Sequence, residues 1–149
     1  MDDQATERMI IDATPDVCYE VAADIARYPQ WAADIKDVVV DESDSEGRAE
    51  RVSFRAGAFG RSISYTLEYD YSRAPEILSW TQTDGDLTSK LDGSYAFSPS
   101  GVDKTEVVYT LEVEMRVPLP GFIKRRAHSR IMHTALEDLR DRVQQSRTS

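Results

Sequence analysis

The sequence contains very little of the chemistry that usually marks a metal or redox site. Its single cysteine, Cys18, can form no internal disulfide and no cysteine-based metal cluster. The two histidines, His128 and His133, lie five residues apart and so point to different faces of a helix, which excludes a shared metal ion there. We therefore expect no metal and no cofactor.

Long apolar runs and excess basic charge are also absent. No apolar segment approaches the roughly 18 residues of a membrane span, and the polar, acidic N-terminus is no secretion signal. The 18 lysines and arginines are outnumbered by 27 acids, for a net charge of −9. This balance argues against non-specific nucleic-acid binding and against docking on an anionic membrane. We expect a cytoplasmic protein with no nucleic-acid partner and no stable membrane insertion.

Standard catalytic motifs are missing as well. There is no serine in a nucleophile elbow, no HExxH zinc motif and no phosphate-binding glycine loop. The composition, 40% hydrophobic and 30% charged, is typical of a globular domain. Since no linker or repeat divides the chain, residues 1–149 form a single domain in our interpretation.

The most organised segment is a C-terminal helix predicted from Leu119 to about Gln145. It follows Pro118-Leu119-Pro120-Gly121 and contains no later proline or glycine. At helical spacing, one wide apolar stripe collects Ala127, His128, Ile131, Met132, Ala135, Leu136, Leu139 and Val143. The C-terminal half of the stripe is aliphatic, whereas the N-terminal half carries Arg125, His128 and Met132. Either these long side chains snorkel to solvent, or this half of the helix faces a cavity.

The preceding chain reads as one strand, two helices and six further strands. Residues 7–13 predict the first strand, and Thr14-Pro15-Asp16 predicts the start of a helix that ends before Pro29. A short helix is expected at residues 28–31. Cys18, on the buried face of the first helix, is interpreted as a small hydrophobe. Alternating apolar and polar residues then predict strands at 35–40, 50–56, 63–71, 77–83, 87–97 and 107–117, connected as an antiparallel meander.

The inward faces of these strands are rich in aromatic residues. Tyr65, Tyr69, Trp80, Tyr95 and Tyr109 occupy inward positions on four strands. Core packing would account for about half of such rings, with their polar tips at the rim of the sheet. Together with Gln82, Arg125 and His128, however, this face is too polar for a dry core. It suits a mostly apolar pocket with a few polar groups that orient a ligand.

Five short motifs occur in order along the chain. They are Asp12-Ala-Thr-Pro-Asp, Asp24-Ile-Ala-Arg-Tyr-Pro-Gln-Trp31, Tyr65-Thr-Leu-Glu-Tyr69, Leu91-Asp-Gly-Ser-Tyr95 and Val117-Pro-Leu-Pro-Gly-Phe-Ile-Lys-Arg-Arg126. In these motifs the chain resembles the START-like (SRPBCC, helix-grip) superfamily. The resemblance is strongest to its bacterial polyketide cyclase/dehydrase and lipid-transport branch, which is related to coenzyme-Q-binding proteins.

The resemblance implies an α+β helix-grip fold over essentially the whole chain. In that fold a seven-stranded antiparallel sheet curls around the long C-terminal helix, two short helices lie between strands 1 and 2, and a hydrophobic cavity remains inside. One such fold hosts many functions. The first hypothesis is therefore binding or transport of a hydrophobic small molecule, such as a lipid, quinone or polyketide-like compound, by a START-like ligand-binding domain. Its candidate ligand-binding residues are Phe54, Tyr65, Tyr69, Trp80, Gln82, Tyr95, Tyr109, Met115, Phe122, Arg125, His128 and Met132.

Two other functions stay open. The alternative is a polyketide aromatase/cyclase, in which Arg125 would polarise a carbonyl while His128 or Tyr95 moves protons. A weaker hypothesis is a protein-interaction module that uses the acidic outer face of the sheet, with Glu68, Asp70, Glu112 and Glu114. The sequence leaves the ligand and the oligomeric state undetermined.

Overall fold

The structure is a computed structural model that describes the backbone of residues 4–58 and 60–148 and the side chains as far as residue 145. Strand β1 (Gln4–Ile11) leads into helix α1 (Pro15–Ala23), a 3-10 turn (Ile25–Arg27) and helix α2 (Tyr28–Trp31). Six strands follow: β2 (Ile35–Ser43), β3 (Ala49–Ala58), β4 (Arg61–Asp70), β5 (Ile77–Gly85), β6 (Thr88–Pro99) and β7 (Thr105–Met115). Helix α3 (Gly121–Thr148) ends the described chain.

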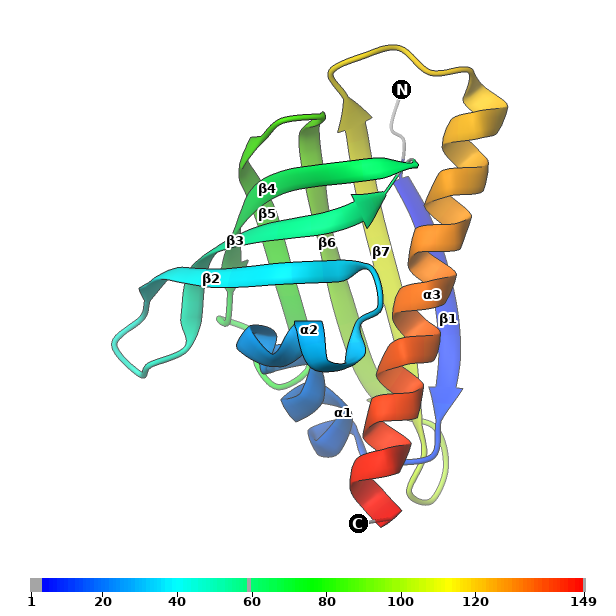
Figure 1. Ribbon diagram of the computed structural model, residues 1–149. Coiled ribbons are helices and arrows are strands. Elements are labelled where there is room, and N and C mark those ends of the chain that lie inside the picture. The colour runs from blue at the N-terminus through cyan, green and yellow to red at the C-terminus, as the bar shows by residue number, and fades with distance from the viewer. Residues whose placement is uncertain (1–3, 59, 149) are drawn as a thin grey trace.

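The seven strands form one antiparallel sheet in the order β1-β7-β6-β5-β4-β3-β2. Figure 1 shows the sheet curling so that β2 to β4 cross over the longer strands, with α3 lying against the sheet beside β1. Helices α1 and α2 close the end of the molecule opposite the β7–α3 loop. This arrangement confirms the α+β helix-grip fold expected from the sequence.

Several element boundaries differ from the sequence prediction: β1 spans residues 4–11 rather than 7–13, β7 ends at Met115 rather than at residue 117, and α3 begins at Gly121 rather than at Leu119. The expected turn over residues 56–60 is shorter, because β3 continues to Ala58, which pairs with Arg61 in β4. Strand β2 extends to Ser43, beyond the predicted end at residue 40. The last two differences lengthen the β2–β3–β4 ribbon that arches over the interior, the first at the β3–β4 turn and the second at the β2–β3 turn.

Helix α1 begins where the sequence predicts. Pro15 occupies the first turn with Asp16, although Thr14 makes no capping hydrogen bond through its side chain. Cys18 points into the core and is fully buried, and burial raises the pKa of its thiol. A buried thiol with a raised pKa is a poor nucleophile, which agrees with the interpretation of Cys18 as a packing residue.

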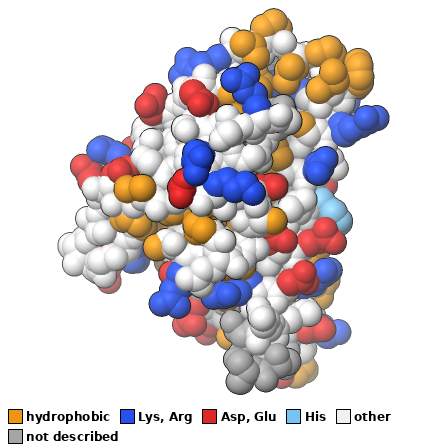
Figure 2. Space-filling model, viewed as in Figure 1, with side chains coloured by type: hydrophobic (Ala, Val, Ile, Leu, Met, Phe, Trp, Pro, Cys, Tyr) orange, Lys and Arg blue, Asp and Glu red, His pale blue; other side chains and the backbone are white. Residues whose placement is uncertain are grey.

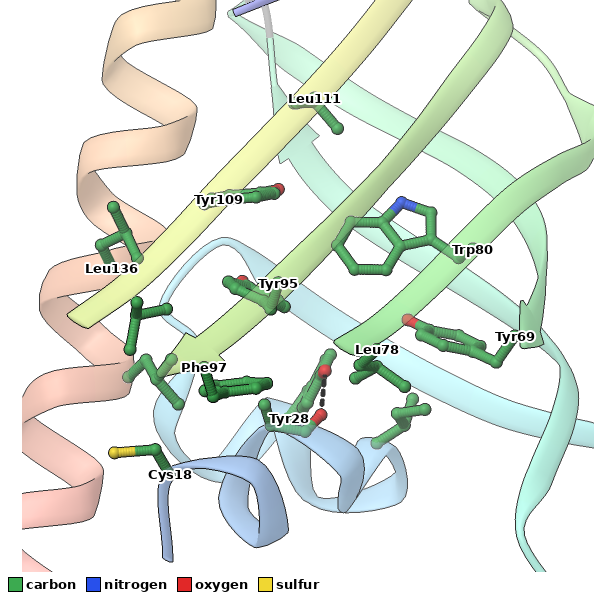
Figure 3. Close-up of a cluster of buried hydrophobic side chains, with 14 of the residues drawn as sticks. Cys18, Tyr28, Tyr69, Leu78, Trp80, Tyr95, Phe97, Tyr109, Leu111 and Leu136 are labelled. Carbon is green, nitrogen blue, oxygen red and sulfur yellow. Dashed lines mark hydrogen bonds between the residues drawn. The ribbon is translucent and has the colours of Figure 1, made fainter. Parts of the chain in front are cut away.

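The core continues from α1 through the sheet to the C-terminal half of α3. Leu136, Leu139 and Val143 are fully buried there, as expected for a helix that seals a core. Figure 3 shows Leu136 approaching the sheet from α3, while Cys18 enters the same cluster from α1. Within the described parts of the chain, no helix is both long and apolar enough to cross a membrane.

Candidate functional site

An inner cavity lies between the concave face of the sheet, α2 and α3. Its volume is about 130 Å³. Its aromatic wall consists of Tyr28, Trp31, Phe54, Tyr65, Tyr69, Trp80, Tyr95 and Tyr109. Figure 3 shows Tyr69, Trp80, Tyr95 and Tyr109 extending from β4, β5, β6 and β7 into one region. Six of the twelve predicted ligand-binding residues, all from strands, therefore share this cavity: Phe54, Tyr65, Tyr69, Trp80, Tyr95 and Tyr109.

Strand register brings these rings into a continuous row. Tyr69 lies opposite Trp80 across β4 and β5, and Tyr95 lies opposite Tyr109 across β6 and β7. The ring centroids are 5.8 Å apart in the first pair and 4.5 Å apart in the second, and Trp80 lies 5.4 Å from Tyr95. Such cross-strand aromatic contacts stabilise the sheet beyond simple burial. They also fix the shape of the cavity wall.

A glycine permits the central contact of the row. Gly93 pairs with Trp80 across β5 and β6, and a Cβ atom at Gly93 would lie only 2.6 Å from Cζ2 of the indole. The same atom would lie 2.7 Å from the carbonyl oxygen of Thr110. Only glycine leaves room for the indole to lie over this strand, so residue 93 helps to set the position of the Trp80 ring.

The phenols of the wall are neutral. Burial is the main reason why the pKa values of Tyr28, Tyr65, Tyr69, Tyr95 and Tyr109 are raised, and neighbouring phenols raise several of them further. The hydroxyl of Tyr28 donates to the carbonyl of Ala22, which holds α1 and α2 together. The wall therefore presents uncharged rings and hydroxyl groups at physiological pH.

One corner of the inner cavity is polar. Thr134 and Asp138 of α3 line it together with Asp34, which precedes β2. The Oδ2 atom of Asp138 accepts a hydrogen bond from the backbone N–H of Ala33 at 2.9 Å. Burial and, to a smaller extent, the nearby Asp34 raise the pKa of Asp138. The sequence analysis missed this corner, although Ile131, Thr134 and Asp138 recur at helical spacing.

A larger hollow, the outer basin, adjoins the inner cavity. Its volume is about 640 Å³, and it shares Asp34, Gly57, Ala58 and Ile131 with the inner cavity. Its apolar lining consists of Leu87, Met115, Val117, Leu119, Phe122 and Ile123, and its basic lining of Lys36, Arg61, Arg126 and Arg130. The predicted residues Met115 and Phe122 lie here. A ligand too large for the inner cavity can extend into this basin.

Comparison with known proteins agrees with this architecture. The sequence profile of the family described as "Polyketide cyclase / dehydrase and lipid transport" matches residues 3–144. The chain belongs to this family. No curated protein matches the sequence.

Solved structures of low sequence identity share the START-like fold. A START superfamily protein from Mycobacterium smegmatis superposes with a TM-score of 0.89 at 22% identity, covering 95% of this chain and 97% of that chain. The Zhui aromatase/cyclase from Streptomyces sp. R1128 superposes with a TM-score of 0.84 at 14% identity, and the match covers 97% of this chain and 94% of that chain. A major latex-like protein from Panax ginseng superposes with a TM-score of 0.74 at 13% identity, and the match covers 95% of this chain and 97% of that chain. At these identities the solved structures show a shared fold and no more.

The START-like chain does not place all predicted site residues in one cavity. Arg125, His128 and Met132 line a separate groove on the other side of α3, next to residues 4–7 of β1. His128 and Met132 are buried there, whereas Arg125 is exposed. The prediction that these three residues share a cavity wall with the strand aromatics is therefore wrong. The physical reason is that the apolar stripe of α3 is wide enough to cover two surfaces, with Ile131 and Ala135 on the cavity side.

Gln82 is also placed differently from the expectation. Its side-chain amide donates to the carbonyl of Thr88 at 2.8 Å and accepts from the Thr88 hydroxyl at 2.6 Å. These bonds tie the amide into the connection between β5 and β6, and Gln82 lines neither the inner cavity nor the outer basin. Both its donor and acceptor functions are used in structure, so a ligand would have to compete for them.

The residues expected to act as polarising and acid–base groups in a cyclase also lie in two different places. Tyr95 lies in the inner cavity, while Arg125 and His128 lie in the groove beside β1. Among the described residues, no cluster of three or more His, Cys, Asp or Glu side chains could hold a metal ion. The ionisable groups that line the inner cavity with the phenols are the carboxyls of Asp34 and Asp138.

Proposed function

We propose that this START-like protein binds a hydrophobic small molecule, such as a lipid, quinone or polyketide-like compound. A ring-bearing end occupies the inner cavity, and the remainder lies in the outer basin. The observation that carries the proposal is the aromatic-walled cavity that opens beside a larger, partly apolar hollow. A protein that only binds and transports such a ligand needs no catalytic residue.

The sizes of the two hollows support this division. The inner cavity, at about 130 Å³, is close to the roughly 150 Å³ of an engineered apolar cavity that binds benzene. Pockets for larger ligands measure about 300–1,000 Å³. The outer basin, at about 640 Å³, falls within that range. One small ring system therefore fits inside, and a longer molecule needs both spaces.

The charged residues that line the inner cavity favour a ligand whose buried end is neutral. The charged side chains among the described residues of the inner cavity are those of Asp34 and Asp138, both acidic. A carboxylate or phosphate would meet like charge and lose its hydration there. A hydroxyl-bearing ring could instead donate a hydrogen bond to Asp138 or Thr134. We therefore expect the buried end of the ligand to be uncharged and to carry a donor.

A matched pair of probes tests this function. Isothermal titration with 2-naphthol should show binding, whereas 2-naphthoate, of similar shape but anionic, should bind about tenfold or more weakly because its charge is desolvated. Ala135→Phe fills the cavity from α3 and should abolish 2-naphthol binding. Ala26→Phe, the same change at an exposed position of the 3-10 turn, should retain it. Equal binding of 2-naphthol by both variants would refute the proposal.

A polyketide cyclase is the second candidate, because Asp138 favours it. A carboxyl with a raised pKa in a cavity lined by neutral phenols has the character of a general acid–base group. Such a cyclase would use Asp138 with Tyr95 or Tyr109 rather than Arg125 and His128. Mass spectrometry of a poly-β-ketone mimic incubated with the protein distinguishes the two functions. A carrier returns the mimic unchanged, whereas a cyclase releases water as the ring closes and dehydrates.

A further inference from the structure

The mouth of the outer basin carries an exposed apolar surface. Phe122 is 64% exposed, Val117 46% and Ile123 43%. All three line the outer basin at the β7–α3 loop and the first turn of α3. Figure 2 shows apolar side chains gathered at this end of the molecule with lysine and arginine side chains beside them. We call residues 116–130 the rim.

The rim is also the most basic part of the chain. Between Met115 and Leu136 there are five basic residues, Arg116, Lys124, Arg125, Arg126 and Arg130, and no acidic one. Since the whole chain carries −9, the rest has a net charge of −14 around this +5 segment. At physiological salt, charges more than about 8 Å away are largely screened. A surface that approaches the rim therefore meets positive charge, although the net charge of the whole chain is −9.

Two features of the rim are unfavourable in water. Lys124, Arg125 and Arg126 lie in the first turns of α3, where the positive end of the helix dipole disfavours cations. Phe122 and Ile123 expose apolar surface next to them. An interface that supplies anions together with an apolar phase would relieve both costs at once. The surface of an anionic bilayer has this combination, with charged headgroups above acyl chains.

We propose that the rim docks on the surface of an anionic lipid bilayer. Val117, Phe122 and Ile123 enter the boundary between headgroups and acyl chains, and Arg126 and Arg130 contact the headgroups. A fluid bilayer accepts projecting apolar side chains without a preformed pocket, whereas a protein partner needs a complementary one. Docking in this orientation turns the outer basin toward the membrane, so a hydrophobic ligand can enter without crossing bulk water.

Vesicle co-sedimentation of the full chain tests the proposal. Vesicles of phosphatidylcholine with phosphatidylglycerol should bind the protein, and vesicles of phosphatidylcholine alone should bind it far less. Added salt should weaken the binding because it screens the charges. Arg126→Glu with Arg130→Glu should reduce partitioning by more than tenfold, since each basic residue near an anionic surface contributes about fivefold. Phe122→Ser with Ile123→Ser should reduce it by about tenfold or more.

Controls at the opposite end of the molecule separate docking from general effects. Val102, 88% exposed in the β6–β7 loop, and Lys104 beside it lie far from the β7–α3 loop. Val102→Ser and Lys104→Glu should leave partitioning unchanged. Circular dichroism checks that every variant is folded.

Three results would overturn the docking proposal: no binding to anionic vesicles, unchanged binding of both rim variants, or equal loss in the controls. Binding to polyglutamate without binding to vesicles would also overturn it, in favour of an acidic protein partner. Because the assay uses lipid vesicles and no 2-naphthol, failure of the proposed ligand-binding function would be seen separately.

Discussion

Raising the pH should unfold this protein through the tyrosines of its cavity. Tyr28, Tyr65, Tyr69, Tyr95 and Tyr109 line the inner cavity, and burial raises the pKa of each. In the unfolded chain a tyrosine ionises near pH 10. Because the pKa is higher in the folded state, the stability linked to each phenol is fully present below about pH 10 and is lost as the pH rises above it.

The size of the effect can be compared with the stability of the fold. One pH unit above the unfolded-state pKa, each buried phenol lowers the free energy of unfolding by about 1.4 kcal/mol. Five phenols together lower it by about 7 kcal/mol. A domain of this kind has a total stability of about 5–15 kcal/mol. We therefore expect cooperative unfolding between about pH 10.5 and pH 12.

Two signals recorded on the same samples check this prediction. Far-ultraviolet circular dichroism follows the fold, and the absorbance of tyrosinate follows ionisation of the phenols. The two should change together in one transition. In denaturing urea the tyrosines should instead titrate with an ordinary pKa. Ionisation of most tyrosines near pH 10 in a protein that keeps its native circular dichroism would refute the reasoning, because the cavity wall would then be solvated.

Four substitutions extend these expectations. Gly93→Ala should displace the indole of Trp80 and destabilise the fold by about 1–3 kcal/mol in thermal melts, with weaker 2-naphthol binding; an unchanged melt would contradict the close approach. Met132→Trp should cost about 1–3 kcal/mol, as Leu139→Trp should, because both residues are fully buried. Since Met132 lies outside the inner cavity, loss of 2-naphthol binding without destabilisation would show that its placement is wrong. Asp138→Asn should stabilise the protein at pH 7, because the raised pKa of Asp138 means that its ionised form lowers the stability of the fold there. In thermal melts at lower pH, near the ordinary carboxyl pKa of about 4, the difference in stability between the variant and the unmodified protein should disappear.

Strand patterning could be predicted because the pleat allows only two faces. In β4, Ile63, Leu67 and Tyr69 are buried as the alternation predicts, while Ser62 and Glu68 face solvent. A slip of one residue would have reversed every assignment, so the agreement extends to the whole register. The boundary near Gly57 was missed because glycine is depleted in strands, yet pairing with Ser62 keeps it in β3.

The register of α3 could not be read fully from the sequence. The helical spacing identified the apolar stripe, and Leu139 and Val143 are buried as expected. A stripe wider than one contact surface, however, does not say which edge faces a cavity. Asp138 was missed for a related reason, since an acid beside that stripe has the pattern of a solvent-exposed residue. Asp138 becomes part of the site because α3 packs beside Ala33 and Asp34, which lie far away in the chain.

The pairing of β1 with β7 has a consequence for how the chain folds. Gln4 lies opposite Glu112, so the first strand of the sheet in chain order pairs only with the last. The ribbons from β2 to β7 can form one after another between neighbours, whereas β1 must wait for a partner from almost the other end of the chain. Until then, the apolar side chains of Met9 and Ile11 have no sheet to join and are open to chaperones or to association with other chains. Helix α3 packs against β1 and lines the inner cavity, so the seam between the first strand and the last helix of the fold joins segments that lie far apart in the sequence.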